Sequence, residues 1–149
     1  MAAIRTATVT WSGDLASGVG TVSAGSSDTF TDLPVSWASR TEDAEGRTSP
    51  EELLAAAHAS CYAMAFSADL GRAGTPPEHL HVSAEVAFEK LETGWTIVSS
   101  ALTVLGHVPG CTAEEFRRIA QDAKDGCPIS RALAGNVALS VQATLETDG

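Results

Sequence analysis

Basic residues are scarce in this sequence. Nine Lys and Arg residues stand against 19 Asp and Glu residues, so the formal net charge is −10 and the isoelectric point is near 4.6. Nucleic acids and anionic lipid surfaces bind proteins largely through Lys and Arg. The sequence therefore speaks against a nucleic acid or a membrane as a partner, and its acidity is typical of a soluble protein surface.

We also expect no secretory signal, and the sequence shows no internal repeats or linkers. Residues 1–5 lead directly into strand-like sequence without the apolar stretch that a signal needs. A length of 149 residues is that of one ordinary domain. We therefore expect a single domain over residues 1–149, located in the cytoplasm.

Signatures of metal and dinucleotide sites are missing as well. The three Cys and four His residues include no pair at the C-x-x-C or H-x-x-x-H spacing of zinc sites. Gly18 and Gly20 begin a glycine pattern, but Ser23 occupies the place of its third glycine. We expect neither a bound metal nor a cofactor.

The most prominent feature that is present is an apolar stretch over residues 49–70, which is rich in the good helix formers Ala and Leu. Ser49 is a good N-cap, Pro50 suits the first helical position, and Glu52 can complete a capping box. Several polar residues interrupt the stretch, which disfavours a membrane span. The pattern predicts a central helix that is apolar, and therefore buried, on nearly every face.

Alternating apolar and β-branched residues predict strands on both sides of this helix. The strands are expected over residues 4–11, 18–23, 33–39, 81–89, 96–105 and 136–146. The two between residues 81 and 105 form a long antiparallel hairpin. A capping box begins a second helix over residues 113–125, and a short helical turn covers residues 129–133. The order β β β α β β α α β indicates an α+β fold.

The three cysteines lie in or beside the predicted helices. Cys61 is in the middle of the central helix, whereas Cys111 precedes and Cys127 follows the second helix. About fourteen helical residues separate Cys111 from Cys127 by ~20 Å, and a disulfide needs Cα atoms within ~7 Å. Any disulfide must therefore include Cys61, with Cys127 or Cys111 as its partner. Cys127 is favoured, because Pro128 makes it an N-cap-like position that stabilises a thiolate.

Neither Cys61 nor His58 carries a function by itself. A cysteine on an Ala-rich helix is more often a core residue than a nucleophile. His58 stands three residues before Cys61, where it could act as a base for the thiol, although such a histidine more often belongs to a core or an interface. A Cys–His hydrolase or transferase and a non-catalytic structural dimer are therefore alternatives to redox chemistry.

Two segments together resemble a known family. Residues 49–65, Ser-Pro-Glu-Glu-Leu-Leu-Ala-Ala-Ala-His-Ala-Ser-Cys-Tyr-Ala-Met-Ala, and residues 127–133, Cys-Pro-Ile-Ser-Arg-Ala-Leu, are similar to motifs of the OsmC/Ohr family of osmotically inducible and organic hydroperoxide resistance proteins. The resemblance covers essentially the whole chain and favours the OsmC branch. It implies an intertwined homodimer in which an antiparallel sheet wraps around a long central helix. It also implies antioxidant activity, as a thiol-dependent peroxidase of the osmotic and oxidative stress response.

The resemblance also assigns roles to four residues. Cys61 corresponds to the peroxidatic cysteine and Cys127 to the resolving cysteine, which close an intramolecular disulfide. A dithiol reductant, lipoyl-type or similar, would reopen that disulfide. Glu51 matches the family's first glutamate after the proline. Arg40, in the charged loop before the central helix, is the expected partner of the thiolate, and Arg47 is its competitor.

The expected roles agree with elementary physical chemistry. Burial in an apolar helix raises the pKa of a thiol, so Cys61 needs a nearby cation such as Arg40, whose guanidinium Glu51 would hold by a bidentate pair. Glu51 and Cys61 are ten residues apart. Because that is ~15 Å along one helix, they cannot readily share one arginine. Two helices packed antiparallel about a two-fold axis would bring them together, so we expect an obligate homodimer with composite sites.

The expected substrate is an organic hydroperoxide, which is reduced to an alcohol. Tyr62, Met64 and Phe66 would give the site an apolar lining that suits such a substrate better than hydrogen peroxide. Cys111 has no counterpart in the family pattern and is interpreted as a bystander.

Overall fold

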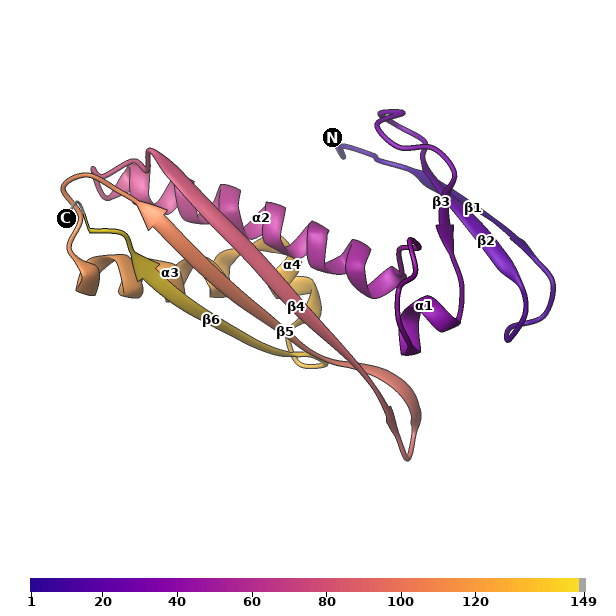
Figure 1. The fold of residues 1–149 in the computed structure, drawn as a ribbon. Coiled ribbons are helices and arrows are strands. Elements are labelled where there is room, and N and C mark those ends of the chain that lie inside the picture. The colour runs from indigo at the N-terminus through magenta and orange to yellow at the C-terminus, as the bar shows by residue number, and fades with distance from the viewer. Residues whose placement is uncertain (148–149) are drawn as a thin grey trace. The chain divides into compact units, whose positions relative to one another are not determined.

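The structure is a computed structural model that describes residues 1–147 (Figure 1). Its internal contacts divide the chain into two compact units, here called the N-terminal unit (Met1–Leu53) and the C-terminal unit (from Leu54 onward). Each unit has its own three-stranded sheet. A single domain over residues 1–149 stays a prediction.

The N-terminal unit is built on an antiparallel sheet. Its strands are β1 (Ala7–Ser12), β2 (Val19–Ala24) and β3 (Leu33–Val35), in that order across the sheet. The antiparallel pairing of β1 with β2 confirms the predicted hairpin, although β1 begins later than predicted. Val22 of β2 is buried, whereas every residue of β1 is exposed. This sheet therefore buries little of its own apolar surface.

The third strand is shorter than the sequence predicts. β3 ends at Val35, and residues 38 and 39 of the predicted strand begin the short helix α1 (Ala38–Thr41) instead. The Ser39 hydroxyl donates to the Ser36 carbonyl oxygen at 2.8 Å, and the Ser39 amide donates to Ser36 Oγ at 3.1 Å. The strand prediction is wrong here because these local serine bonds replace the sheet ladder. Arg40 consequently lies on a helical turn rather than in a loop.

Helix α2 (Pro50–Arg72) begins as predicted. The backbone N–H of Glu52 donates to Ser49 Oγ at 3.1 Å, which confirms Ser49 as the N-cap. The Glu52 carboxylate, expected to complete a capping box, accepts instead from Thr48 Oγ1 at 2.7 Å. The cap thus ties the preceding loop to the first turn of the helix.

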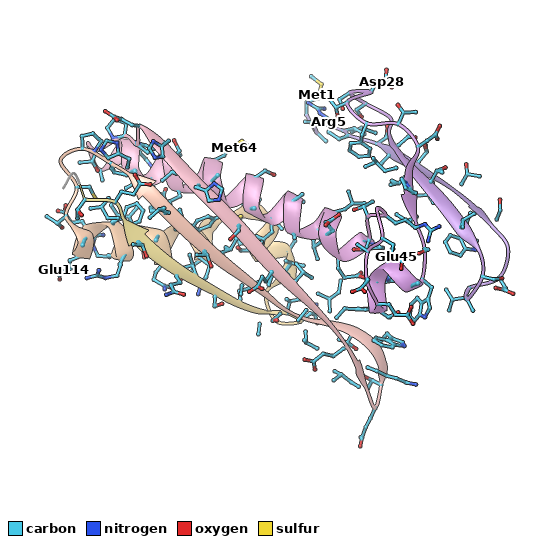
Figure 2. All side chains as sticks on the ribbon, in the orientation of Figure 1. Met1, Arg5, Asp28, Glu45, Met64 and Glu114 are labelled. Carbon is cyan, nitrogen blue, oxygen red and sulfur yellow. The ribbon has the colours of Figure 1, made fainter. Side chains whose placement is uncertain are left out.

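Within one chain, α2 is buried along one face. His58, Tyr62, Phe66 and Leu70 follow at four-residue intervals and are fully buried. Met64 is 69% exposed, and its side chain projects into solvent (Figure 2). The expected burial on nearly every face is wrong for one chain, because one sheet and one further helix cover a single side of α2. Among the described residues, α2 is long and apolar enough to cross a membrane, with a hydropathy of 1.2, but core helices of soluble proteins share this property.

The C-terminal sheet is mixed rather than antiparallel. β4 (His79–Leu91) and β5 (Gly94–His107) form the predicted hairpin, and β6 (Ala138–Leu145) pairs with β5 in parallel. Helices α3 (Ala113–Gly126) and α4 (Pro128–Leu133) lie between β5 and β6 in the chain. These helices carry the chain back to the end of the sheet where β5 begins, so β6 runs in the same direction as β5. The expected α+β fold is confirmed, and its strands pair antiparallel as expected except for β6, which is parallel to β5.

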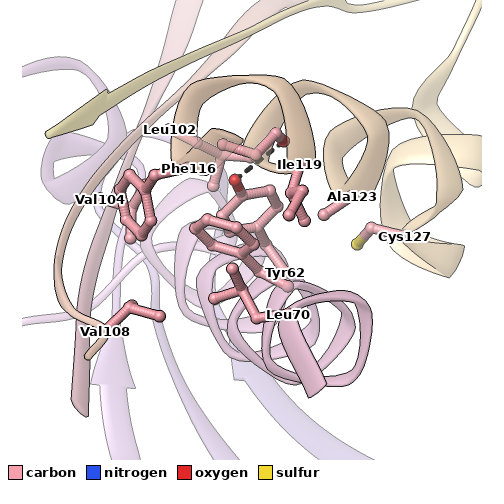
Figure 3. Packing of buried hydrophobic residues seen from close by; sticks show 11 residues of the cluster. Tyr62, Leu70, Leu102, Val104, Val108, Phe116, Ile119, Ala123 and Cys127 are labelled. Atoms are coloured by element: carbon pink, nitrogen blue, oxygen red, sulfur yellow. Dashed lines mark hydrogen bonds between the residues drawn. The ribbon is translucent and has the colours of Figure 1, made fainter. Parts of the chain in front are cut away.

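Helices α2 and α3 cover one face of this sheet and enclose the core of the C-terminal unit (Figures 1 and 3). The Phe66 ring lies between those of Tyr62 and Phe116, at centroid distances of 5.6 Å and 4.9 Å. Leu102 of β5 fills the sheet side of the cluster. The Tyr62 hydroxyl donates to the Ala120 carbonyl oxygen at 3.0 Å, shown dashed in Figure 3. The core therefore fixes the middle of α2 against the second half of α3.

Candidate active site

Cys61 lies at the middle of α2, where the helix passes from buried to exposed surface. Its side chain is half-buried and packs at the margin of the core cluster. It lines a pocket of about 530 Å³ whose other walls are mostly apolar. The other lining residues are Ala57, Ser60, Met64, Ala65, Pro128 and Ile129. The thiol can therefore meet a molecule that enters this pocket.

Cys127 stands where α3 ends and α4 begins. It is the N-cap of α4, with Pro128 at the first helical position, as the sequence predicts. Its side chain is fully buried at the edge of the core cluster (Figure 3). Cys61 and Cys127 are both free thiols, and their side chains lie within hydrogen-bonding reach of each other. The structure thus brings together the two cysteines that the sequence favoured as partners.

Several groups act on the Cys61 thiol. Burial raises its pKa, and the backbone N–H of Ile129 lowers it by hydrogen bonding. The Cys127 side chain raises the pKa, whereas the Arg131 charge lowers it. The net result is a raised pKa, because burial is the largest of these effects. The cation and the amide on α4 therefore do not offset the effect of burial on the pKa of Cys61.

His58 belongs to a buried hydrogen-bond network. Its Nδ1 lies 2.6 Å from Ser100 Oγ on β5, and its Nε2 lies 2.8 Å from Ser130 Oγ on α4. Burial lowers the pKa of His58, so the neutral imidazole is favoured. Both ring nitrogens are engaged by serines rather than aimed at Cys61. Sequence reasoning missed Ser100 and Ser130, because separations of 42 and 72 residues leave no local pattern.

Arg40 and Glu51 form a bidentate ion pair within the N-terminal unit. Arg40 Nε donates to Glu51 Oε1 at 2.8 Å, and Nη2 donates to Oε2 at 3.0 Å. The Glu51 side chain is 8% exposed and that of Arg40 is 28% exposed. The Arg40 guanidinium also lies 5.4 Å from the centroid of the Trp37 ring. The expected pair is present, and it is Arg40, not the exposed Arg47, that holds this carboxylate.

An apolar pocket of about 410 Å³ adjoins this ion pair. Its lining comes from all three strands of the N-terminal unit, from α1 and from the start of α2. The lining residues are Val9, Trp11, Leu15, Val22, Val35, Ser36, Trp37, Arg40, Pro50 and Leu53. Arg40 is the one charged residue of this set, so its guanidinium lines a pocket that is otherwise mostly apolar. The sequence held no signal for this pocket, since its residues come from five separate segments.

The predicted lining of the Cys61 pocket is correct for one residue of three. Met64 lines the pocket. Tyr62 and Phe66 are fully buried in the core, where they pack against each other and α3. The helical period explains this difference, since residues four apart share the buried face and Met64 falls outside it.

Cys111 and possible metal ligands complete the survey of reactive groups. Cys111 is a half-buried free thiol that donates to the Thr112 carbonyl oxygen at 3.4 Å, and burial raises its pKa. Among residues 1–147, no three His, Cys, Asp or Glu side chains are grouped to hold a metal ion.

Comparison with known proteins gives consistent results. The family model described as OsmC-like protein matches residues 42–142. Peroxiredoxin OsmC of Escherichia coli K12 is 41% identical over 132 residues, which are 89% of this chain and 91% of that protein. The crystal structure of the organic hydroperoxide resistance protein OhrB of Bacillus subtilis superposes with a TM-score of 0.69 at 24% identity, covering 93% of this chain and 98% of that one. An OsmC-like protein of unknown function from Vibrio cholerae gives a TM-score of 0.75 at 17% identity, covering 96% and 100%. These two structures share the fold.

Proposed function

The chain belongs to the OsmC-like protein family, and from this premise we propose that it is a cysteine-based peroxidase that reduces organic hydroperoxides to alcohols. The observation that carries the proposal is that two free thiols, Cys61 and Cys127, act on each other within hydrogen-bonding reach, and that Cys61 lines an apolar pocket. Adjacent thiols can give up two electrons and become a disulfide. The name of the Escherichia coli relative, peroxiredoxin, supports the same reaction class.

In the first step the Cys61 thiolate attacks the terminal oxygen of the hydroperoxide. An S–O bond forms, the O–O bond breaks, and the alkoxide leaves and takes up a proton to become the alcohol. Cys61 is then a sulfenic acid. Because Met64 and Ile129 make the pocket apolar, it suits an alkyl or lipid chain better than hydrogen peroxide.

In the second step the Cys127 sulfur attacks the sulfur of the sulfenic acid. The S–S bond forms, the S–O bond breaks, and the oxygen leaves as water with the proton of the Cys127 thiol. A dithiol reductant, lipoyl-type or similar, then restores both thiols by two exchange reactions. A reducing cytoplasm would supply such a dithiol, and we propose that location.

Arg40 and Glu51 are proposed to activate Cys61. Burial raises the pKa of Cys61, so a further cation is required. Arg40 is suited to this role for two reasons. Glu51 holds the Arg40 guanidinium in a fixed orientation through two hydrogen bonds, and the other residues of the pocket that Arg40 lines are mostly apolar. We assign this contact to a homodimer in which Arg40 of one copy meets Cys61 of the other. The exposed apolar face of α2 around Met64 supports a second copy packing there.

The test is to titrate the reduced protein with cumene hydroperoxide. One equivalent should produce one intramolecular Cys61–Cys127 disulfide, seen as a loss of two hydrogens in mass and located by peptide mapping. Cys61→Ser should abolish peroxide consumption. Cys127→Ser should consume one equivalent and stop as a sulfenic acid that dimedone traps. Cys111→Ser is the matched control and should behave as the wild type does.

Two other outcomes would overturn the proposal. Ester hydrolysis without peroxide that survives Cys127→Ser would favour the Cys–His hydrolase, against which the serine bonds of both His58 nitrogens already weigh. Thiols that form no disulfide with the hydroperoxide and resist alkylation at neutral pH would favour the non-catalytic dimer.

A further inference from the structure

A buried hydrogen-bond chain joins β5 to α2, which carries Cys61, and to α4, whose N-cap is Cys127. It runs from Ser100 on β5 through His58 on α2 to Ser130 on α4, at distances of 2.6 Å and 2.8 Å. All three residues are at most 1% exposed. Breaking such a bond leaves a buried polar group without a partner, so the chain resists rearrangement. The proposed peroxidase steps make no use of His58.

The α4 end of this hydrogen-bond chain lies beside three groups that act on Cys61. Cys127 is the N-cap of α4, and the Ile129 N–H and the Arg131 charge both act to lower the pKa of the Cys61 thiol. α4 has six residues, and a helix so short has little stability of its own. Its position must therefore be set by tertiary contacts, and Ser130 lies between Ile129 and Arg131.

We propose that His58 is a positioning residue that holds α4 against α2 through its hydrogen bond to Ser130 and so keeps Cys127 at the Cys61 sulfur. A neutral imidazole has one donor and one acceptor nitrogen, so one serine accepts from the ring and the other donates to it. Ser100 on β5 is bonded to the other ring nitrogen. His58 acts through α4 and not on the thiol, since both its nitrogens are bonded to serines.

The consequence concerns how readily the two sulfurs join. Closure of the disulfide requires the Cys127 sulfur to approach the Cys61 sulfur, and its rate scales with the fraction of time that α4 holds this geometry. The same fraction sets the equilibrium with oxidised glutathione, in which both thiols lose a hydrogen and one oxidised glutathione becomes two reduced ones. The inference rests on the proposed function where peroxide is the oxidant, whereas the glutathione equilibrium tests it without peroxide.

The experiment compares Ser130→Ala with Ser100→Ala. Each variant removes one fully buried hydroxyl and one bond to the same ring, but only Ser130 belongs to α4. One hydrogen bond corresponds to about a 2–10-fold change in population. Ser130→Ala should lower the equilibrium constant for the Cys61–Cys127 disulfide in a glutathione buffer by about 3–10-fold. It should slow closure after hydroperoxide oxidation by the same factor, and Ser100→Ala should leave both values within about twofold of wild type.

A second pair of variants tests the same hydrogen bond in case Ser130→Ala does not fold. The His58→Gln amide reaches toward the place of Nε2 and can still meet Ser130, whereas the His58→Asn amide occupies the place of Nδ1 and stops short of Ser130. His58→Gln should retain more of the disulfide equilibrium than His58→Asn. Equal effects of Ser130→Ala and Ser100→Ala, or equal effects of His58→Gln and His58→Asn, would overturn the inference. If the wild type forms the disulfide with glutathione but not with a hydroperoxide, the proposed function fails and this comparison still decides the role of His58.

Discussion

The two units of the chain differ in how they bury apolar side chains. In the C-terminal unit, eleven buried residues form one cluster around Phe66 and Phe116. Among the described residues of the N-terminal unit, Val22 is the one hydrophobic residue that is buried. Six of the ten large hydrophobic residues that are exposed also lie there: Met1, Ile4, Val9, Trp11, Leu15 and Val19. The C-terminal unit therefore has a hydrophobic core of its own, whereas the N-terminal unit leaves much of its apolar surface exposed.

The chemistry divides along the same line. The two thiols lie on the unit with its own core, and the Arg40–Glu51 pair lies on the unit that buries little. A single chain can therefore hold the two sulfurs together, but the raised pKa of Cys61 leaves it poorly activated. Under the proposed composite site, assembly of two chains would both cover the N-terminal apolar surface and deliver the missing cation. The fold of one chain would then bring the two sulfurs together, and the assembly of two chains would make Cys61 reactive.

The largest effect is expected from a charge on the exposed face of α2. Met64→Glu would place an unpaired carboxylate where we propose that a second copy packs, and burial of such a charge is strongly unfavourable. Analytical ultracentrifugation should show a dimer for the wild type and a monomer for this variant, with peroxidase activity at least about 100-fold lower. Leu105→Glu, at an exposed leucine of β5, is the control and should remain an active dimer. A wild-type monomer with full activity would break the comparison.

Next in size is the loss of the cation. Arg40→Met keeps much of the side-chain volume but removes the charge, so Cys61 oxidation by cumene hydroperoxide should slow by about 10²–10³-fold. The pKa of Cys61, read from the pH midpoint of its alkylation, should rise further, because the thiolate loses its partner. Arg47→Met, at an exposed loop position, should stay within about twofold of wild type. If Arg47→Met slowed Cys61 oxidation more than Arg40→Met, Arg47 and not Arg40 would be the cation that activates Cys61.

A smaller effect, on stability, compares one glycine from each unit. A Cβ at Gly106 would lie 2.7 Å from the Phe116 ring, which is fully buried and cannot yield, so Gly106→Ala should destabilise the fold by about 1–3 kcal/mol. A Cβ at Gly20 would lie 2.8 Å from the Trp11 ring, which is 41% exposed and can move, so Gly20→Ala should cost less. Urea unfolding measures both. Gly126→Ala, with nothing within 4 Å, is the neutral control. A reversed order would show that the N-terminal unit is the more tightly packed.

The smallest effect concerns pH. Burial lowers the pKa of His58 in the folded chain, so the unfolded chain binds a proton more readily. The free energy of unfolding should therefore fall as the pH drops below ~6.5 and level off below the folded pKa. Urea unfolding between pH 7.5 and 5 measures the slope, and His58→Asn should flatten it. An equal slope in both proteins would assign the pH dependence to other groups.

Much of the local structure could be predicted from the sequence. The N-cap Ser49, the capping box of α3 and the break at Pro128 depend on neighbours a few residues apart, and the structure confirms each of them. The β4–β5 hairpin follows equally from its alternation and its turn. The pairing of Arg40 with Glu51 was expected as well, because a resemblance identified both residues and a guanidinium fits a carboxylate.

The sequence by itself determined most of the elements, although not α1, because helix caps, turns and periodicity act over one or two turns of chain. It also singled out Cys61 and Cys127 as the cysteines to examine. Tertiary structure alone decided that β6 runs parallel to β5, that Tyr62 and Phe66 serve the core rather than a pocket, and that serines 42 and 72 residues away hold His58. These features arise where distant segments compete for the same buried space. No local pattern records that competition, because its outcome depends on which surfaces meet when the whole chain packs.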